Sequence, residues 1–321
     1  MQVYLFALTR KDIYMKSYTT KKFRAKTPTV VALGCFDGVH RGHTAVINEA
    51  VRIARERSLP CAIFTFREPP KNYFVPNAAP LITDYREKRR LMRTLGVDIF
   101  VCIPFDGEIG SLSPEEFFED ILLERLCATH LVCGFNYSFG KSGRGDTVLM
   151  RRLCNEKRIG LTCVESVTDG EITVSSSAIR QAVENGDMEL AERYLGRPFS
   201  ICAPIVGGQK LARKLGFPTL NQILDKNTLI PRHGVYVTKI TVGKKVMFGI
   251  TNVGVRPTVS DHTLCAESHI FDFEGDLYGK TVRVEFLKYL RPETEFPSIE
   301  ALTEQVKLDI ADAKNFISET K

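Results

Sequence analysis

The stretch Val30–Ala50 reads Val-Val-Ala-Leu-Gly-Cys-Phe-Asp-Gly-Val-His-Arg-Gly-His-Thr-Ala-Val-Ile-Asn-Glu-Ala. Its first four residues are apolar, as in a strand that is buried on both faces. Three glycines follow, Gly34, Gly38 and Gly42, and from Thr44 onward the apolar residues recur at helical spacing. The stretch therefore predicts a buried strand, a tight glycine-containing turn and a helix, in that order.

Two histidines, His40 and His43, fall at the expected start of this helix. A helix N-terminus offers free backbone N–H groups and the positive end of the helix dipole, so it is a ready site for phosphate. Each imidazole can donate a further hydrogen bond, and the glycines let the backbone approach a ligand closely. Two ordinary turn histidines are the alternative, but the preceding strand and glycine turn favour a phosphate site. A Walker loop is excluded because no Gly-Lys-Ser/Thr follows the glycines.

The length of 321 residues predicts two domains, each able to bury its own core. Hydrophobic residues make up 44% of the chain and charged residues 26%, which is typical of a soluble globular protein. The formal net charge of +6 suits anionic ligands but is too small to require nucleic acid.

Nine cysteines, an odd number without a Cys-x-x-Cys pair, argue against a disulfide framework or a zinc site. Five stand in apolar, strand-like runs and are expected to be core residues in a reducing compartment: Cys61, Cys102, Cys133, Cys163 and Cys202. The apolar run Val3–Leu8 is too short for a signal-peptide core, and no run approaches membrane-spanning length. We therefore expect a cytoplasmic protein with no membrane partner.

Strands and helices are expected to alternate through about residue 170. The expected strands after Val30–Leu33 are Cys61–Phe66, Ile99–Ile103, Leu131–Gly134 and Leu161–Val167, and the expected helices are Asp84–Leu95, Ser113–Leu126 and Thr147–Lys157. This order predicts an α/β domain with a doubly wound, Rossmann-like parallel sheet, whose ligands bind at the carboxyl ends of the strands. Two basic regions, Arg10–Lys26 and the cluster around Arg86 and Lys88, are expected to be solvated surface.

Two further stretches face the same edge of the expected sheet. Gly134–Asp146 is a glycine-rich, polar loop directly after a strand, and taken alone it could be an ordinary surface loop. A cluster of hydroxyl residues lies before Arg180: Ser175, Ser176 and Ser177. Serines commonly cap helices, but with an arginine one turn on they could form a second phosphate clamp.

The composition changes near Pro198, after which apolar residues alternate in Val235–Ile240, Val246–Ile250 and Thr281–Phe286. Turns at Val242-Gly243-Lys244 and Glu274-Gly275-Asp276 fit antiparallel hairpins. These patterns predict a small antiparallel β-barrel, followed by a terminal helix over Ser298–Phe316. We place the domain boundary so that residues 1–186 form the α/β domain and residues 187–321 the barrel domain.

The barrel carries a second set of polar residues. Thr219 and Asn221, two residues apart in an extended segment after Gly216, project to one side. Their oxygens suit Mg²⁺ carrying ATP phosphates, although an Asn-capped turn explains them equally well. Glu267 is the natural general base to take a proton from an attacking hydroxyl. The loop around Arg256 could lie against a planar ligand.

In this order, and over nearly the whole chain, these motifs resemble those of the bacterial bifunctional riboflavin kinase/FMN adenylyltransferases, or FAD synthetases. The resemblance covers Gly34–His43, Ser111–Phe117, Phe139–Asp146, Ser175–Arg180, Pro218–Asn221 and Asp276–Gly279. His-x-Gly-His is also the signature of the wider nucleotidyltransferase superfamily. No single motif is decisive, but together they are highly specific.

The resemblance implies two successive reactions that use ATP with Mg²⁺. The barrel domain would phosphorylate riboflavin to FMN and release ADP, with Glu267 as base and Thr219 and Asn221 as metal ligands. The α/β domain would then transfer AMP from a second ATP to FMN, giving FAD and pyrophosphate, with His40 and His43 on the reacting phosphates. The other implied ATP contacts are Gly34, Phe36, Gly38, Gly42, Ser175, Ser176, Ser177, Arg180 and Gly216. The implied flavin contacts are Asn136 and Arg256.

The chain departs from the family pattern at three places. The family usually has an acidic-Pro-His-Pro stretch where this chain reads Arg67-Glu68-Pro69-Pro70. In the kinase loop, Ala212 and Leu220 stand where glycine and alanine are common. The missing histidine weakens any assignment of flavin contacts in that stretch. Ala212 and Leu220 do not touch the groups that carry the chemistry, so there we expect slower or altered kinetics rather than an inactive domain.

Two other functions stay open at this point. One is a single-activity FMN adenylyltransferase with a degenerate barrel. The presence of Thr219, Asn221 and Glu267 together argues against this alternative. The other is an RNA-binding or tRNA-charging protein. No Lys-Met-Ser-Lys-Ser-like loop is present, and the aromatic residues do not interleave with cations, so we expect no nucleic-acid partner. The sequence specifies no oligomeric state.

Overall fold

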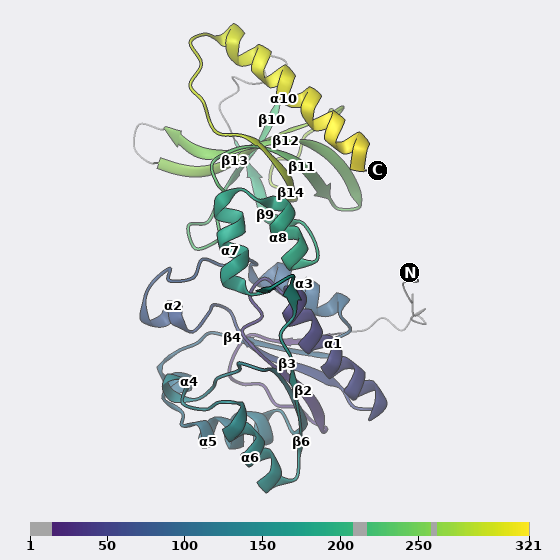
Figure 1. The fold of residues 1–321 in the computed structure, drawn as a ribbon, viewed down its shortest axis with the longest axis vertical. Helices are drawn as coiled ribbons and strands as arrows, with labels where there is room; N and C mark the ends of the chain where they lie inside the picture. The colour runs from purple at the N-terminus through teal and green to yellow at the C-terminus, as the bar shows by residue number, and fades with distance from the viewer. Residues whose placement is uncertain (1–14, 208–216, 258–261, 321) are drawn as a thin grey trace. The chain divides into compact units, whose positions relative to one another are not determined.

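The computed structural model describes residues 15–207, 217–257 and 262–320, and the chain divides into two compact units (Figure 1). The first unit comprises the residues up to Phe36, Gly42–Phe74 and Lys88–Ser166, and the second comprises Asp37–Arg41, Val75–Glu87 and the chain from Val167 onward. Two short segments from the first third of the sequence therefore belong to the same unit as the C-terminal half.

The first unit is built on a six-stranded sheet with the order β1-β4-β3-β2-β5-β6. The strands are β1 (Lys16–Tyr18), β2 (Thr29–Leu33), β3 (Cys61–Phe66), β4 (Ile99–Ile103), β5 (Ala128–Gly134) and β6 (Gly160–Val164). Each neighbouring pair is parallel. All five residues of β2 are buried, as expected of a central strand covered on both faces. The predicted Rossmann-like parallel sheet is confirmed.

The helices connect these strands in the predicted alternation. They are α1 (Arg41–Glu56), α2 (Lys71–Phe74), α3 (Tyr85–Thr94), α4 (Gly107–Ser111), α5 (Pro114–Glu116), a π-helix (Phe117–Arg125), a 3₁₀ turn (Lys141–Gly143) and α6 (Thr147–Lys157). At the start of α5, Ser113 Oγ accepts from the Glu116 amide at 3.1 Å, and Glu116 Oε2 accepts from the Ser113 amide at 2.7 Å. This reciprocal capping box confirms the helix start that the sequence predicted.

The interpretation of Arg10–Lys26 as solvated surface is only partly right for the part that the structure describes. Lys16, Lys22, Arg24 and Lys26 are exposed, but the segment also contains a strand and a core residue. Lys16–Tyr18 form the parallel edge strand β1, and the Phe23 ring is buried in the core of the first unit. Three residues are too few for a visible period, so only pairing with β4 reveals the strand.

The second unit is a closed six-stranded barrel with the order β10-β13-β12-β11-β14-β9. Its elements are α7 (Ser176–Asn185), α8 (Met188–Leu195), β9 (Phe199–Val206), β10 (Thr219–Ile223), β11 (Gly234–Val242), β12 (Lys245–Pro257), β13 (His262–Ile270), β14 (Thr281–Arg291) and α10 (Ile299–Thr320). A short ribbon, β7 (Thr168–Asp169) with β8 (Ile172–Thr173), precedes α7. All barrel pairs are antiparallel, so the predicted barrel with a terminal helix is confirmed.

One of the two predicted hairpins is wrong. Gly243 turns directly between the paired strands β11 and β12, as expected. The turn at Gly275 instead connects β13 to β14, and these strands are not paired: β14 lies between β11 and β9. Local turn chemistry cannot distinguish a hairpin from a connection across the barrel, because both need the same reversal of the chain.

Substitution of Gly234 tests how closely β11 and β14 approach. Gly234 has φ +144°, and a Cβ there would come within 2.3 Å of the Arg291 carbonyl oxygen. Gly243, with φ +61° and open space around it, is the matched control. Gly243→Ala should lower the free energy of unfolding by about 1–2 kcal/mol through backbone strain. Gly234→Ala should lower it by about 1–3 kcal/mol more, because the strands must separate. Urea denaturation measures both, and equal losses would contradict the close approach.

Candidate active sites

The turn after β2 begins with an aromatic contact within the first unit. Phe36 is buried and has a left-handed backbone, with φ +49°. Its ring meets the His43 imidazole edge-on, with the ring centroids 5.3 Å apart. A Cβ on Gly34 would lie 2.9 Å from the Phe36 ring, which explains the glycine. The structure thus brings together Gly34, Phe36 and His43, and places His43 and Gly42 in the first turn of α1.

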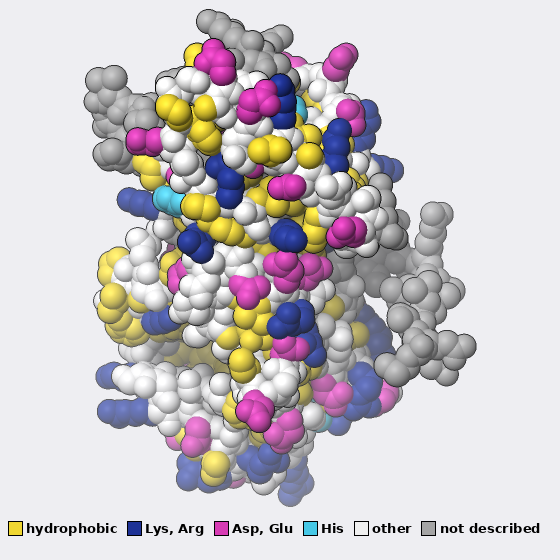
Figure 2. All heavy atoms as spheres, turned by 45° about the horizontal axis from the view of Figure 1, so that its top comes forward, with side chains coloured by type: hydrophobic (Ala, Val, Ile, Leu, Met, Phe, Trp, Pro, Cys, Tyr) yellow, Lys and Arg dark blue, Asp and Glu magenta, His cyan; other side chains and the backbone are white. Residues whose placement is uncertain are grey.

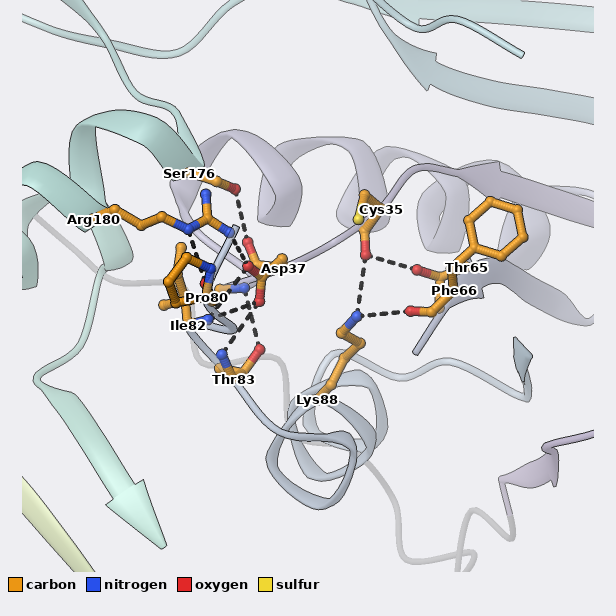
Figure 3. A network of polar contacts seen from close by, with 11 residues as sticks. Cys35, Asp37, Thr65, Phe66, Pro80, Ile82, Thr83, Lys88, Ser176 and Arg180 are labelled. Atoms are coloured by element: carbon orange, nitrogen blue, oxygen red, sulfur yellow. Dashed lines mark hydrogen bonds and ion pairs between the residues drawn. The ribbon is translucent and has the colours of Figure 1, made fainter. Parts of the chain in front are cut away.

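The next residues, Asp37–Arg41, are held through a buried carboxylate (Figure 3). Asp37 is 2% exposed and accepts from the amides of Ile82 at 3.1 Å and Thr83 at 3.2 Å. Its second oxygen pairs with the Arg180 guanidinium. The Gly38 amide donates to the Thr83 hydroxyl at 3.1 Å. Because a buried carboxylate is costly without such partners, these contacts fix where the turn begins.

The serine cluster before α7 contacts the same turn. Ser176 Oγ donates to the Asp37 carbonyl oxygen at 3.0 Å. Ser175 is the N-cap of α7 and accepts from the Ala178 amide at 3.2 Å, whereas Ser177 is exposed in the first turn of the helix. The cap confirms the predicted helix start. Binding of phosphate by the three serines stays a prediction.

Arg180 has structural partners that the sequence did not indicate. Besides pairing with Asp37, it donates through Nε to the Pro80 carbonyl oxygen at 2.9 Å. In this structure its guanidinium therefore holds the turn and the segment around Pro80 together (Figure 3). Contact between Arg180 and a phosphate stays a prediction.

His40 lies in a strained and buried part of the turn. The preceding Val39 has φ +43°, a conformation that costs a β-branched residue on the order of 1–3 kcal/mol. Arg197 donates to the Val39 carbonyl oxygen at 3.1 Å and to that of Gly38 at 2.6 Å. Burial, and to a lesser extent the positive charge of Arg197, lower the pKa of His40 to about 4. The imidazole is therefore neutral at neutral pH, with one nitrogen donating and the other accepting.

Lys88 corrects the prediction that the basic face of α3 is entirely solvated. Its side chain is fully buried and donates to the carbonyl oxygens of Cys35 at 3.2 Å and Phe66 at 3.0 Å (Figure 3). These oxygens lie at the carboxyl ends of β2 and β3, so the ammonium ties the two strand ends together. A signal was present in the sequence: Lys88 shares a helical face with the buried Leu91 and Met92.

The loop after β5 is closed on itself. Phe139 and Gly145 exchange backbone hydrogen bonds of 2.9 Å in both directions. Gly140 has φ +70°, and a Cβ there would come within 2.6 Å of the Pro114 nitrogen, so the loop packs closely on the start of α5. Asn136, the predicted flavin contact, is exposed at the start of this loop. Its ligand stays a prediction.

The barrel brings Thr219, Asn221 and Glu267 together. Thr219 and Asn221, two residues apart, lie on the same face of β10. Asn221 lies directly opposite Glu267 on β13. Asn252 on β12 lies opposite Glu267 on the other side, and its amide donates to Glu293 Oε1 at 2.9 Å. Two carboxylates therefore approach this face, of which the sequence indicated only Glu267. His269 contacts the Pro218 carbonyl oxygen at 3.1 Å and packs against Phe217, as a structural residue would.

Three residues singled out in the sequence lie outside what the structure describes. Gly216 and Ala212 fall in the segment 208–216, and Arg256 lies in β12 but its side chain is outside the described part. Their roles stay predictions.

Comparison with known proteins identifies the family of this chain. A family model described as FAD synthetase matches residues 22–178, and one described as riboflavin kinase matches residues 195–317. The bifunctional riboflavin kinase/FMN adenylyltransferase of Bacillus subtilis is 36% identical over 303 residues, covering 93% of this chain and 95% of the relative. The chain belongs to this bifunctional family. The predicted enzyme, both a riboflavin kinase and an FMN adenylyltransferase, is confirmed.

Further relatives agree with membership in the riboflavin kinase/FMN adenylyltransferase family. The Escherichia coli K12 protein of the same name is 35% identical over 294 residues, with 91% of this chain and 94% of the relative covered. A solved structure from Streptococcus pneumoniae, named a macrolide-efflux protein, is 31% identical and covers 92% of this chain and 97% of its own, with a TM-score of 0.83.

Of the helices in the described residues, none has both the length and the apolar character needed to cross a bilayer.

Substitution of Asp37 tests the anchor of the turn Asp37–Arg41. Asp37→Ala should lower the free energy of unfolding by about 3–5 kcal/mol, because it leaves the Arg180 charge buried without its partner. Asp37→Asn, which keeps one acceptor oxygen, should lower the free energy of unfolding by less than Asp37→Ala does. Urea denaturation monitored by circular dichroism measures both. The anchor would be contradicted if Asp37→Ala were as stable as the wild type.

Proposed function

We propose that the two reactions of this family are divided between an α/β domain, residues 1–186, and a barrel domain, residues 187–321. The barrel domain phosphorylates riboflavin, and the α/β domain adenylylates the FMN that results. The matches at 22–178 and 195–317 support a boundary in this region. The observation that carries the kinase half is the register of β10 and β13, which sets Asn221 directly opposite Glu267.

In the kinase reaction, Glu267 takes the proton from the ribityl 5′-hydroxyl of riboflavin. The hydroxyl oxygen then attacks the γ-phosphorus of ATP, and ADP leaves. Thr219 and Asn221 hold the metal that accompanies ATP, Gly216 approaches the phosphates and Arg256 contacts the flavin. The in-line transfer requires little covalent chemistry from the protein, so positioning by these residues supplies most of the catalysis.

The residues present fit Mg²⁺ that arrives with ATP. Within the described ranges, no group of three or more His, Cys, Asp and Glu side chains could hold a metal ion. Mg²⁺ commonly uses one or two protein oxygens together with water and substrate phosphates. The Thr219 hydroxyl and the Asn221 amide oxygen, on one face of β10, are such a donor pair. When bound, the ion neutralises charge on the phosphates.

In the adenylyltransferase reaction, an FMN phosphate oxygen attacks the α-phosphorus of ATP and pyrophosphate leaves. His40 and His43 bind the reacting phosphates, and Gly34, Phe36, Gly38 and Gly42 shape the turn that carries them. A neutral His40 can donate to a phosphate oxygen without a permanent charge. Ser175, Ser176, Ser177 and Arg180 complete the phosphate site, and Asn136 contacts the flavin. No covalent intermediate is needed, because positioning and stabilisation of developing charge suffice.

An aromatic cluster offers a surface for the flavin ring in the first unit. Phe105 lies 5.2 Å from Phe66, 5.6 Å from Tyr73 and 6.0 Å from Phe74, measured between ring centroids. Tyr73 and Phe74 are 53% and 67% exposed, unusually high for such side chains. They follow the Arg67-Glu68-Pro69-Pro70 stretch in which the family histidine is missing. Stacking on these rings would compensate for that loss.

The formal net charge of +6 suits small anionic substrates, and the cysteines suit a reducing compartment. On the face shown in Figure 2, basic and acidic side chains are interspersed. The structure describes all nine cysteines, and none of them forms a disulfide, which suits a reducing compartment. We propose a cytoplasmic enzyme whose ligands are riboflavin, FMN, FAD, ATP, ADP and pyrophosphate, with no nucleic-acid or membrane partner.

Two variants separate the reactions. Glu267→Gln should abolish formation of FMN from riboflavin and leave conversion of FMN to FAD intact, because only the kinase base is lost. His43→Ala should do the reverse. Purified protein is incubated with ATP, Mg²⁺ and either riboflavin or FMN, and the flavins are resolved by chromatography. Loss of both activities in both variants would refute the two-site assignment.

A substitution in the aromatic cluster tests the flavin surface. Phe74→Ala should raise KM for FMN about 5- to 10-fold, since one stacked ring contributes roughly 1–1.5 kcal/mol. KM for ATP in the same reaction should stay constant. Val148→Ala, which truncates a 74% exposed apolar residue on α6, is the control. An unchanged KM for FMN in Phe74→Ala would place the flavin elsewhere.

A further inference from the structure

We propose that Arg197, in the link between α8 and the first barrel strand, is a positioning residue for adenylyl transfer. It acts by holding the backbone of the turn that carries His40. The inference rests on the proposed function of this turn and adds a residue that none of the motifs includes. Its hydrogen bonds to Gly38 and Val39 lie within the second unit.

The guanidinium of Arg197 spans consecutive carbonyl groups. Nη2 donates to the Gly38 oxygen at 2.6 Å and Nη1 to the Val39 oxygen at 3.1 Å. A planar fork of donors suits two neighbouring acceptors, whereas a lysine ammonium would make a single point contact. The bonded residues have left-handed backbones, with φ +86° at Gly38 and +43° at Val39. Since a valine persists in such a conformation only where its surroundings impose it, the arginine contacts explain why the turn keeps its shape.

The other anchors hold a different part of the turn. Asp37 and the Gly38 amide are bound by Ile82, Thr83 and Arg180, which fixes the entrance. The carbonyl groups of Gly38 and Val39, directly before His40, are bound by Arg197. Loss of Arg197 would therefore release the His40 end of the turn and leave its entrance in place.

The anchoring segments are themselves fastened to the barrel. Leu81 exchanges backbone hydrogen bonds of 2.8 Å with Asn227 and Leu229, and Glu87 pairs with Arg283 on β14 at 2.5 Å. Arg197 stands two residues before β9. The barrel that carries out one reaction thus provides the frame for a turn that serves the other.

Arg197 also acts on His40 through its charge. Burial is the larger cause of the lowered pKa of His40, and the Arg197 charge adds to it. The remaining charged groups of the turn are paired within the same unit, Asp37 with Arg180 and Arg41 with Asp169. Removal of the Arg197 charge should therefore raise the pKa of His40 above about 4. The imidazole would then stay protonated up to a higher pH than in the wild type.

The test compares Arg197→Ala, Arg197→Lys and the control Arg152→Ala, an exposed arginine on α6, in the full-length chain. Conversion of FMN to FAD and of riboflavin to FMN is measured on the same preparations between about pH 3.5 and 8, a range that includes the pKa of His40 at about 4. In Arg197→Ala, kcat for FAD formation should fall about 10- to 100-fold through misplacement of His40, with KM for FMN nearly constant. The acid limb of its pH profile should move to higher pH. Riboflavin phosphorylation should stay within about twofold of wild type, which shows that the barrel is folded.

Arg197→Lys should keep the wild-type acid limb, because the charge remains, and recover part of kcat. The inference is overturned if Arg197→Ala matches the wild type and Arg152→Ala in FAD formation. It is also overturned if both reactions fall by the same factor with the acid limb in place, since that pattern indicates a purely structural role. A wild-type chain that forms no FAD from FMN would instead refute the proposed function, and this inference with it.

Discussion

The turn that carries His40 depends on one buried interaction, the Asp37 carboxylate among its donors. Two backbone amides donate to its oxygens and a guanidinium pairs with it. The backbone carbonyl oxygen of Asp37 accepts a hydrogen bond from the Ser176 hydroxyl. Asp37 is only 2% exposed, and such a set of partners is needed to offset the free-energy cost of burying its charge. The donors come from positions 82, 83, 176 and 180, so segments far apart in sequence must assemble before the turn takes its shape. Arg197 completes this assembly at the His40 end.

The proposed kinase site depends on a different constraint, the closure of the barrel. β10 is only five residues long, yet it pairs with β13 on one side and β9 on the other. A slip of one residue in β10 would turn Asn221 away from Glu267, because side chains alternate along a strand. Buried hydroxyls stabilise the register inside the barrel: Thr238, Thr251 and Ser268 form a chain of 2.8 Å contacts across β11, β12 and β13. The inner face of the barrel thus holds the outer face, with Asn221 and Glu267, in register.

Much of the fold could be predicted from local patterns. The apolar run at Val30–Leu33, the capping box at Ser113 and the alternation in β11 each reflect physics that acts within a few residues. Predictions failed where the deciding partner is distant in sequence. β1 is a strand only because β4 lies beside it, and Lys88 is buried because two strand ends offer it carbonyl oxygens. The turn at Gly275 joins strands that the barrel separates.

The sequence by itself determined the fold class, the family and the chemical types at the two sites, because motifs such as His-x-Gly-His and Pro-Thr-x-Asn are contiguous. Only the tertiary structure decided what those residues touch. Arg180, expected on a phosphate, is bound to Asp37 and Pro80, and Arg197, which belongs to no motif, reaches the carbonyl groups beside His40. The physical reason is that hydrogen bonds and buried charges are satisfied in space, by whichever groups the folded chain brings within about 3 Å.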